Sequence, residues 1–203
     1  MSASAGRRPV APGTTTIRGE RCTLRAFREN ELDELVAARL ADDPDGFAGP
    51  REHGAKPREE LSRRIANSGR VHDGWLEFAI EAEGRLVGDV QARGGRRMLP
   101  PGVWELGIEL YGKPSRGRGV GTEATALITG HLFGELGAGR VQAGTDVANA
   151  PMRAVLRKLG FAEEGVLRGF MPGREGDPAR HDYVLFGVTA AGWQADPERA
   201  TRR

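Results

Sequence analysis

The strongest chemical signal in this 203-residue chain is a glycine-rich segment, residues 115–122, with the sequence Ser-Arg-Gly-Arg-Gly-Val-Gly-Thr. It joins an expected strand to the start of an expected long helix. Its three glycines let backbone approach a ligand closely, and the first amides of a helix have no partner within that helix. With the helix dipole and the charges of Arg116 and Arg118, this favours a bound phosphate. The segment is neither a Walker A loop nor a Gly-x-Gly-x-x-Gly motif, so alone it predicts an anion cradle or a flexible turn.

A second segment, residues 146–152, has an asparagine placed to begin a helix. Asparagine is favoured at the N-cap and proline in the first turn, and here Asn149 precedes Pro151. Gly160 is expected to end the same helix. The residues alone favour a helix cap at Asn149 and leave a ligand-binding role open.

Carboxylates on the strand before the glycine-rich segment could transfer protons. Strand alternation places Glu105, Gly107 and Glu109 on one face, which suits a strand that lines a ligand site. A solvated carboxylate at a strand end is the alternative for Glu105. In another expected strand, His181 and Asp182 are adjacent and therefore point to opposite faces. No Gly-x-Ser-x-Gly motif accompanies them, so a hydrolase triad is unsupported.

A series of strands and helices must position these residues. Two apolar runs around residues 82–84 predict an antiparallel hairpin, and Asn30 is expected to cap the first helix. Strands are expected at residues 23–26, 75–81, 85–91, 103–111, 140–146, 161–168 and 181–188, and further helices from Pro57, from residues 120 to 136 and after Asn149. This order is typical of an α/β fold, a mixed sheet with helices on both faces.

The apolar pattern assigns one domain to residues 17–193. Residues 1–16 and 194–203 lack apolar periodicity and are predicted to be a disordered leader and tail. Cys22 is the only cysteine, and the four histidines show no metal-ligand spacing, so neither a disulfide framework nor a metal site is expected. No run of about 18 apolar residues and no secretory signal occurs, and a cytoplasmic location is expected.

The charge balance argues against a nucleic-acid-binding protein. The formal net charge is +2 and the pI is about 9.0, but the excess arginines lie in the predicted leader and tail. The body of the chain is close to neutral, which is poor evidence for a basic groove. No nucleic-acid partner is expected.

The glycine-rich segment and the Asn149 segment together resemble the GNAT superfamily of acetyl-CoA-dependent N-acetyltransferases. Residues 116–121 are similar to its (Gln/Arg)-x-x-Gly-x-(Gly/Ala) pyrophosphate loop. Residues 122–124, 149–152 and 158–161, with 21–25 and 182–193 at the two ends, are similar to the branch of ribosomal-protein N-terminal acetyltransferases (RimJ/RimL-like). The resemblance covers nearly all of residues 17–193, and its order of elements agrees with the order expected above.

The resemblance implies a mostly antiparallel mixed sheet whose central parallel strands, residues 103–111 and 140–146, splay to admit the pantetheine arm of acetyl-CoA. The diphosphate would rest on the amides of residues 118–122, and the arm would pair with a strand edge. The implied cofactor-binding residues are Glu109, Leu110, Tyr111, Arg116, Gly117, Arg118, Gly119, Val120, Gly121, Thr122 and Asn149. No metal is implied.

The implied reaction is direct attack of a primary amine on the thioester in a ternary complex, which needs a proton acceptor and benefits from an acid. Glu105 lies eleven residues before Arg116, which resembles the offset of the general-base glutamate in some members. Where many members carry an acidic tyrosine on the Asn149 helix, this chain has Leu156. Tyr183 on the last expected strand is therefore the candidate acid.

The acceptor is expected to be a protein N-terminus or a small amine. An aminoglycoside or peptide antibiotic is the first alternative, and a catalytically silent module that binds CoA is the second. The family generally shapes its acceptor site with the segment between the first two helices, here residues 42–57, whose acidic residues would suit a cation. The resemblance also admits a homodimer.

Overall fold

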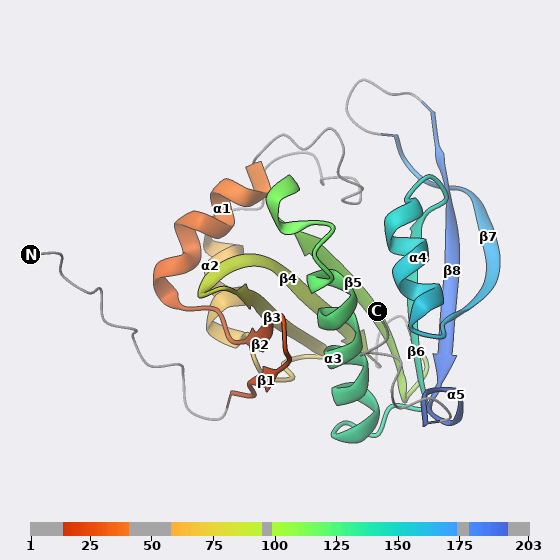
Figure 1. Ribbon diagram of the computed structural model, residues 1–203, viewed down its shortest axis with the longest axis horizontal. Helices are drawn as coiled ribbons and strands as arrows, with labels where there is room; N and C mark the ends of the chain where they lie inside the picture. The colour runs from red at the N-terminus through yellow and green to blue at the C-terminus, as the bar shows by residue number, and fades with distance from the viewer. Residues whose placement is uncertain (1–13, 41–57, 95–98, 174–178, 195–203) are drawn as a thin grey trace, which may run out of the picture.

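The computed structural model in Figure 1 describes residues 14–40, 58–94, 99–173 and 179–194. Residues 1–13 of the expected leader, residues 195–203 of the expected tail and the expected acceptor segment at 42–57 lie outside the described residues. Thr15, near the end of the expected leader, is described, and its amide donates to the carbonyl of Gly69 at 2.8 Å.

One mixed sheet forms the centre of the described structure. Its strand order is β1-β2-β3-β4-β5-β6-β8-β7, and every neighbouring pair is antiparallel except β5 and β6. The strands are β1 (Ile17–Arg18), β2 (Thr23–Arg25), β3 (Trp75–Ala82), β4 (Arg85–Gly94), β5 (Val103–Leu110), β6 (Arg140–Asp146), β7 (Ala162–Met171) and β8 (His181–Thr189). The expected mixed, mostly antiparallel sheet is therefore confirmed.

The hairpin expected around residues 82–84 joins β3 to β4. Glu83 and Gly84 have φ angles of 51° and 75°, the left-handed pair that a tight hairpin turn with the strands' own twist requires. Along the hairpin, Ala79 faces one side of the sheet and Phe78 the other, so both faces are covered by protein.

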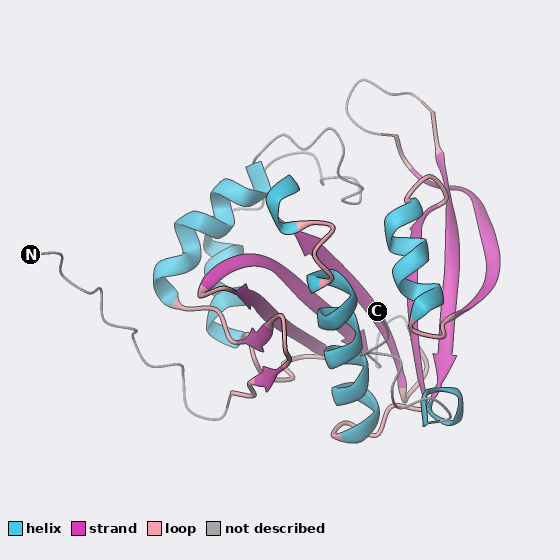
Figure 2. Cartoon of the chain, viewed as in Figure 1, coloured by secondary structure: helices cyan, strands magenta, loops and turns pink. Residues whose placement is uncertain are grey.

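Helices cover both faces of the sheet (Figure 2). The helices are α1 (Leu32–Leu40), α2 (Arg58–Asn67), α3 (Val120–Gly134), α4 (Ala150–Lys158) and the short α5 (Ala190–Gln194). On one face, Leu35 of α1 and Ile65 of α2 pack in a small apolar cluster with Ala79. On the other face, α3 and α4 pack over a larger cluster that includes Phe78. No helix in the described ranges is both long and apolar enough to cross a membrane.

The first helix does not begin as expected. Asn30 lies inside a short 3-10 segment, Glu29–Glu31, and Arg28 occupies the cap position instead. The amide of Arg28 donates to the Glu31 carboxylate at 2.7 Å. The expectation that Asn30 caps the helix was wrong because Glu31 also forms ion pairs with Arg25 and Arg28, which hold it at the helix start.

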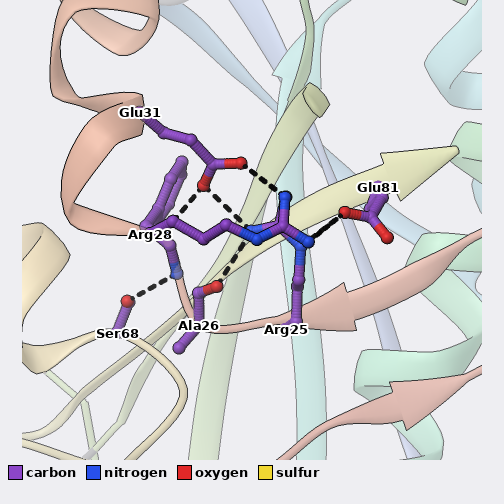
Figure 3. A network of polar contacts seen from close by, with 7 residues as sticks. Arg25, Ala26, Arg28, Glu31, Ser68 and Glu81 are labelled. Carbon is purple, nitrogen blue, oxygen red and sulfur yellow. Dashed lines mark hydrogen bonds and ion pairs between the residues drawn. The ribbon is translucent and has the colours of Figure 1, made fainter. Parts of the chain in front are cut away.

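Those ion pairs form a buried network around Arg25 (Figure 3). The Arg25 guanidinium donates to both oxygens of Glu31 at 2.9 and 2.6 Å and to Glu81 at 2.9 Å. Arg28 also donates to Glu81, at 2.6 Å. Burial acts to lower the pKa of Arg25, but its bonds to Glu31 and Glu81 outweigh burial and raise it. The network fastens β2 and the start of α1 to β3.

Replacement of Arg25 tests how much stability this network contributes. Arg25→Met leaves the buried Glu31 carboxylate without its main partner and removes one of the two arginines that bind partly buried Glu81. We expect the free energy of unfolding at pH 7 to fall by about 3–5 kcal/mol. Burial tends to raise the pKa of Glu81, but the two arginines lower it below its ordinary value. The stability that Glu81 contributes is thus present above its unfolded pKa and lost as pH falls through the folded pKa.

Urea unfolding of wild type and Arg25→Met at pH 7 and in acid, with exposed Arg18→Met as the control, measures the effect. The difference between wild type and Arg25→Met should narrow in acid, and the control should stay within about 0.5 kcal/mol of wild type. The expectation would be contradicted if Arg25→Met lost no more free energy of unfolding than the control, or if its loss did not depend on pH.

Candidate active site

The two parallel strands separate at the centre of the sheet. Their register covers only Val103–Leu106 with Arg140–Ala143. Beyond this point β5 continues to pair with β4 as far as Leu110, while β6 continues to pair with β8 as far as Asp146. Figure 1 shows β5 and β6 diverging toward their carboxyl ends. A strand edge therefore faces the space between them, at the end of the sheet where the glycine-rich segment begins.

The glycine-rich segment ends on the amino terminus of α3, as the sequence predicts. Gly117 and Gly119 have φ angles of 74° and 80°, a left-handed conformation that other residues adopt at a cost. The first intrahelical bond runs from the Glu123 amide to the Gly119 carbonyl at 3.0 Å. The amides of Val120, Gly121 and Thr122 precede that bond, so the helix presents them with its positive dipole end. This geometry fits a phosphate group.

Three arginines surround this helix end. Arg116 donates to the carbonyl of Leu110 at 3.3 Å, and exposed Arg118 forms an ion pair with Glu83. Arg21 lies beside Gly119, because a Cβ built on that glycine would be 3.2 Å from both Cδ and Nε of Arg21. Sequence reasoning did not single out Arg21 for an anion, since nothing local links it to a loop almost one hundred residues away.

Glu123 fixes Arg21 at this position. Its buried carboxylate accepts hydrogen bonds from three successive amides, those of Glu20, Arg21 and Cys22, at 3.0, 2.8 and 2.7 Å. Burial, together with Glu123, raises the pKa of the Cys22 thiol to about 12. The first turn of α3 therefore anchors the β1–β2 turn, and Cys22 is a packed neutral thiol.

Glu105 lies where β5 and β6 still pair, on the sheet face that α1 and α2 cover. The register places Glu105, Gly107 and Glu109 on one face, as expected from alternation. The Glu105 carboxylate forms an ion pair with Arg93 and accepts a hydrogen bond from Gln142 at 3.0 Å. The side chain is 28% exposed, so it is a paired carboxylate within the sheet face.

The other residues implied by the resemblance lie around the divergence. The hydroxyl of Tyr111 donates to buried Asp89 at 2.6 Å, and Leu110 contacts the position of a Cβ on Gly121 at 3.4 Å. Asn149 caps α4, since its Oδ1 accepts from the Met152 amide at 3.1 Å, and its Nδ2 donates to Thr145 at 3.0 Å. The expected cap is confirmed, and the ligand-binding role stays a prediction.

Tyr183 pairs in register with Asp146 at the carboxyl end of β6, and its ring centroid lies 5.9 Å from that of Phe170. Leu156, the residue where a tyrosine acid is common, is fully buried between α4 and the sheet. It therefore serves packing. Within the described part of the chain, no group of three or more His, Cys, Asp or Glu residues is arranged to bind a metal ion.

Substitution of Gly119 tests the backbone geometry of the loop. Gly119→Ala forces an alanine to adopt a φ of 80° and brings its Cβ against Arg21. We expect a loss of about 1–2 kcal/mol in the free energy of unfolding. Gly130→Ala in the middle of α3, where a Cβ meets nothing within 4 Å, should instead add about 0.5–1 kcal/mol. Denaturant unfolding of both variants is the measurement, and equal effects would contradict the assigned loop conformation.

Comparison with known proteins also identifies an acetyltransferase domain. Residues 21–162 match the family model described as acetyltransferase (GNAT) domain. A structure of RimJ from Mycobacterium smegmatis in complex with CoA-disulfide has a TM-score of 0.70 at 23% identity, covering 92% of this chain and 96% of that one. RimL, a ribosomal L7/L12 alpha-N-protein acetyltransferase, has a TM-score of 0.64 at 17% identity, with coverage of 91% and 99%.

A spermidine N-acetyltransferase SpeG chimera from Vibrio cholerae and hSSAT reaches a TM-score of 0.71 at 17% identity, covering 86% of this chain and 99% of that one. At these identities the structural matches show a common fold, while their acceptors differ. The family match itself covers more than half of the chain, across β2, the glycine-rich loop, the diverging strands and α4. The resemblance seen in the sequence is confirmed: the chain belongs to the GNAT acetyltransferase family.

Proposed function

We propose that this acetyltransferase moves the acetyl group of acetyl-CoA to a primary amine by direct attack in a ternary complex. The observation that carries the proposal is the divergence of β5 and β6 next to the amino terminus of α3. The strand edge exposed by the divergence suits an extended arm with amide groups, and the amino terminus of α3 suits a diphosphate. Their adjacency matches the two parts of one CoA molecule.

In this proposal the diphosphate contacts the amides of residues 118–122, and Arg21 and Arg116 supply positive charge nearby. The pantetheine arm pairs with the edge of β5 at residues 109–111 and passes Asn149 on the other side. The proposed cofactor-binding set is the one implied by the resemblance, from Glu109 to Tyr111, from Arg116 to Thr122, and Asn149, with Arg21 added by the structure. No metal is required by the proposed chemistry.

Two side chains are proposed for proton transfer, Glu105 and Tyr183. An amine attacks a thioester only as the free base, so a cationic acceptor must lose a proton near the thioester, directly or through water. Both side chains lie on the face opposite to α3 and α4. The acceptor would therefore approach from that face, while the diphosphate stays on the face that α3 covers.

We infer a protein N-terminus or a small amine as the acceptor. Several carboxylates share the proposed acceptor face: Asp89, Glu105, Glu109 and Asp146. Their negative charge suits a cationic amine, including an aminoglycoside or a peptide antibiotic. A cytoplasmic location, a homodimer and the absence of a nucleic-acid partner stay predictions from the sequence.

Acetyl-CoA binding tests the cofactor site directly. Gly121→Trp places bulk on the first turn of α3 at a helical φ, so it obstructs the amides without straining the loop. We expect the Kd for acetyl-CoA to rise by at least about tenfold, equivalent to about 1.4 kcal/mol. Gly134→Trp, at the opposite end of the same helix, should bind as wild type does. Calorimetry that finds equal Kd values for both variants would place the diphosphate elsewhere.

Turnover tests the acceptor and Glu105 together. CoA release is measured with peptides carrying Ser or Ala N-termini, aminoglycosides, peptide antibiotics, polyamines and amino acids. Glu105→Gln should lower turnover by about 10²-fold or more if Glu105 accepts the amine proton. Glu164→Gln, which disrupts an ion pair with Arg140, is the matched control and should leave turnover unchanged. Acetyl-CoA binding without release across the panel would favour a silent CoA-binding module.

A further inference from the structure

The structure forms a histidine–aspartate pair that strand alternation alone would not suggest. His181 at the start of β8 has its Nδ1 2.7 Å from Oδ2 of Asp146 at the end of β6. The other oxygen of Asp146 accepts a hydrogen bond from the Ala148 amide at 2.7 Å. Asp182, the sequence neighbour of His181, is used elsewhere, since it accepts from the Gly169 amide at 2.6 Å.

The pair lies at the end of the sheet where β5 and β6 diverge. Asp146 is three residues beyond Ala143, the last residue of β6 in register with β5. Alternation along β6 places Asp146 on the same face as Gln142, whose side chain donates to Glu105. The pair therefore shares the face proposed for the acceptor. It lies farther toward the carboxyl end of β6 than Gln142, the residue that pairs with Glu105.

The Asp146 contact sets the chemistry of the imidazole. An ionised carboxylate only accepts hydrogen bonds, so Nδ1 must carry the proton and Nε2 of the neutral ring is an acceptor. Asp146 is buried, with a side chain 11% exposed, whereas that of His181 is 33% exposed. A buried carboxylate that orients a partly exposed imidazole is the arrangement in which a histidine works as a general base.

Two charged side chains nearby, one along the chain and one on α4, bind backbone carbonyls. Arg180 donates to the carbonyl of Phe170 at 2.8 Å, and Arg153 of α4 donates to the carbonyl of Val147 at 2.8 Å. Met171 of β7, which is uncharged, pairs with His181 in register. On its own strand, Tyr183 shares the face of His181. The Asp146 carboxylate is therefore the group that orients the ring through Nδ1.

We propose that His181, in place of Glu105, is the catalytic residue whose Nε2 takes the proton from the acceptor ammonium, with Asp146 as its positioning residue. This rests on the proposed function. The free amine forms an N–C bond to the thioester carbon, the C–S bond breaks, and its electron pair leaves on the CoA sulfur. The second amine proton neutralises that thiolate, and the imidazolium returns its proton to solvent. The products are the N-acetyl amine, CoA thiol and one released proton.

Kinetics of His181→Gln on the full chain test the assignment. We expect kcat/KM to fall by about 10²–10⁴-fold, the usual contribution of a general base, with the Kd for acetyl-CoA unchanged. The acidic limb of the wild-type pH profile should disappear in the variant, because that limb reports the protonation of His181. Asp146→Asn should lose turnover and shift the same limb, while exposed His72→Gln should match wild type in rate and profile.

Turnover of His181→Gln within about threefold of wild type, with the acidic limb intact, would overturn the assignment. If none of the acceptors is turned over, a second measurement, which needs no acceptor, tests the role of His181. In nitrogen-15 histidine spectra, neutral His181 should carry its proton on Nδ1, and its ring signals should move more with acetyl-CoA than with CoA. A proton on Nε2, or signals that neither compound moves, would refute the proposal even though acetyl-CoA binds.

Discussion

The short parallel contact between β5 and β6 is the constraint on which the rest of the site depends. Four residues on each strand pair, and each strand then follows its antiparallel neighbour instead. Backbone groups in a sheet need hydrogen-bond partners, and a strand edge can find them in an extended ligand that carries amides. β5 leads into the glycine-rich loop and β6 into the Asn149 cap, so the two predicted motifs follow the carboxyl ends of the two diverging strands.

The sheet also separates two kinds of chemistry. The helix amides and the loop arginines lie on the face that α3 covers, where a diphosphate would be stabilised. Glu105, Tyr183 and the Asp146–His181 pair lie on the opposite face, where an amine would lose its proton. In the proposed function, a thioester that reached from one face to the other through the divergence would bring both halves of the reaction together.

Two sets of buried charges keep these parts in place. Glu123 fastens the β1–β2 turn to the first turn of α3, and the Arg25 network fastens β2 and α1 to β3. Buried carboxylates are costly unless several donors satisfy them, and here each accepts two or more hydrogen bonds. These groups hold the backbone in position and have no proposed role in the reaction. The Cys22 thiol beside Glu123 is buried and neutral, so it is also part of the packing.

The sequence by itself determined the features that depend on near neighbours. The bounds of β6, the hairpin turn at Glu83, the cap at Asn149 and the glycine-rich helix start all follow from local propensity. The alternation of Glu105 and Glu109 onto one face was also predictable, because it needs only the period of a strand.

Only the tertiary structure decided which distant side chains meet. Sequence spacing carries no information about contacts such as Arg21 with Gly119, or Asp146 with His181, because the chain between them forms other elements whose arrangement brings the two residues together. The failed cap at Asn30 has a more local cause, since the Glu31 carboxylate accepts from the Arg28 amide, three residues away, and from Arg25, six residues away. Local preference at a cap is worth about 1 kcal/mol, whereas leaving a buried carboxylate without its partner costs about 3–5 kcal/mol.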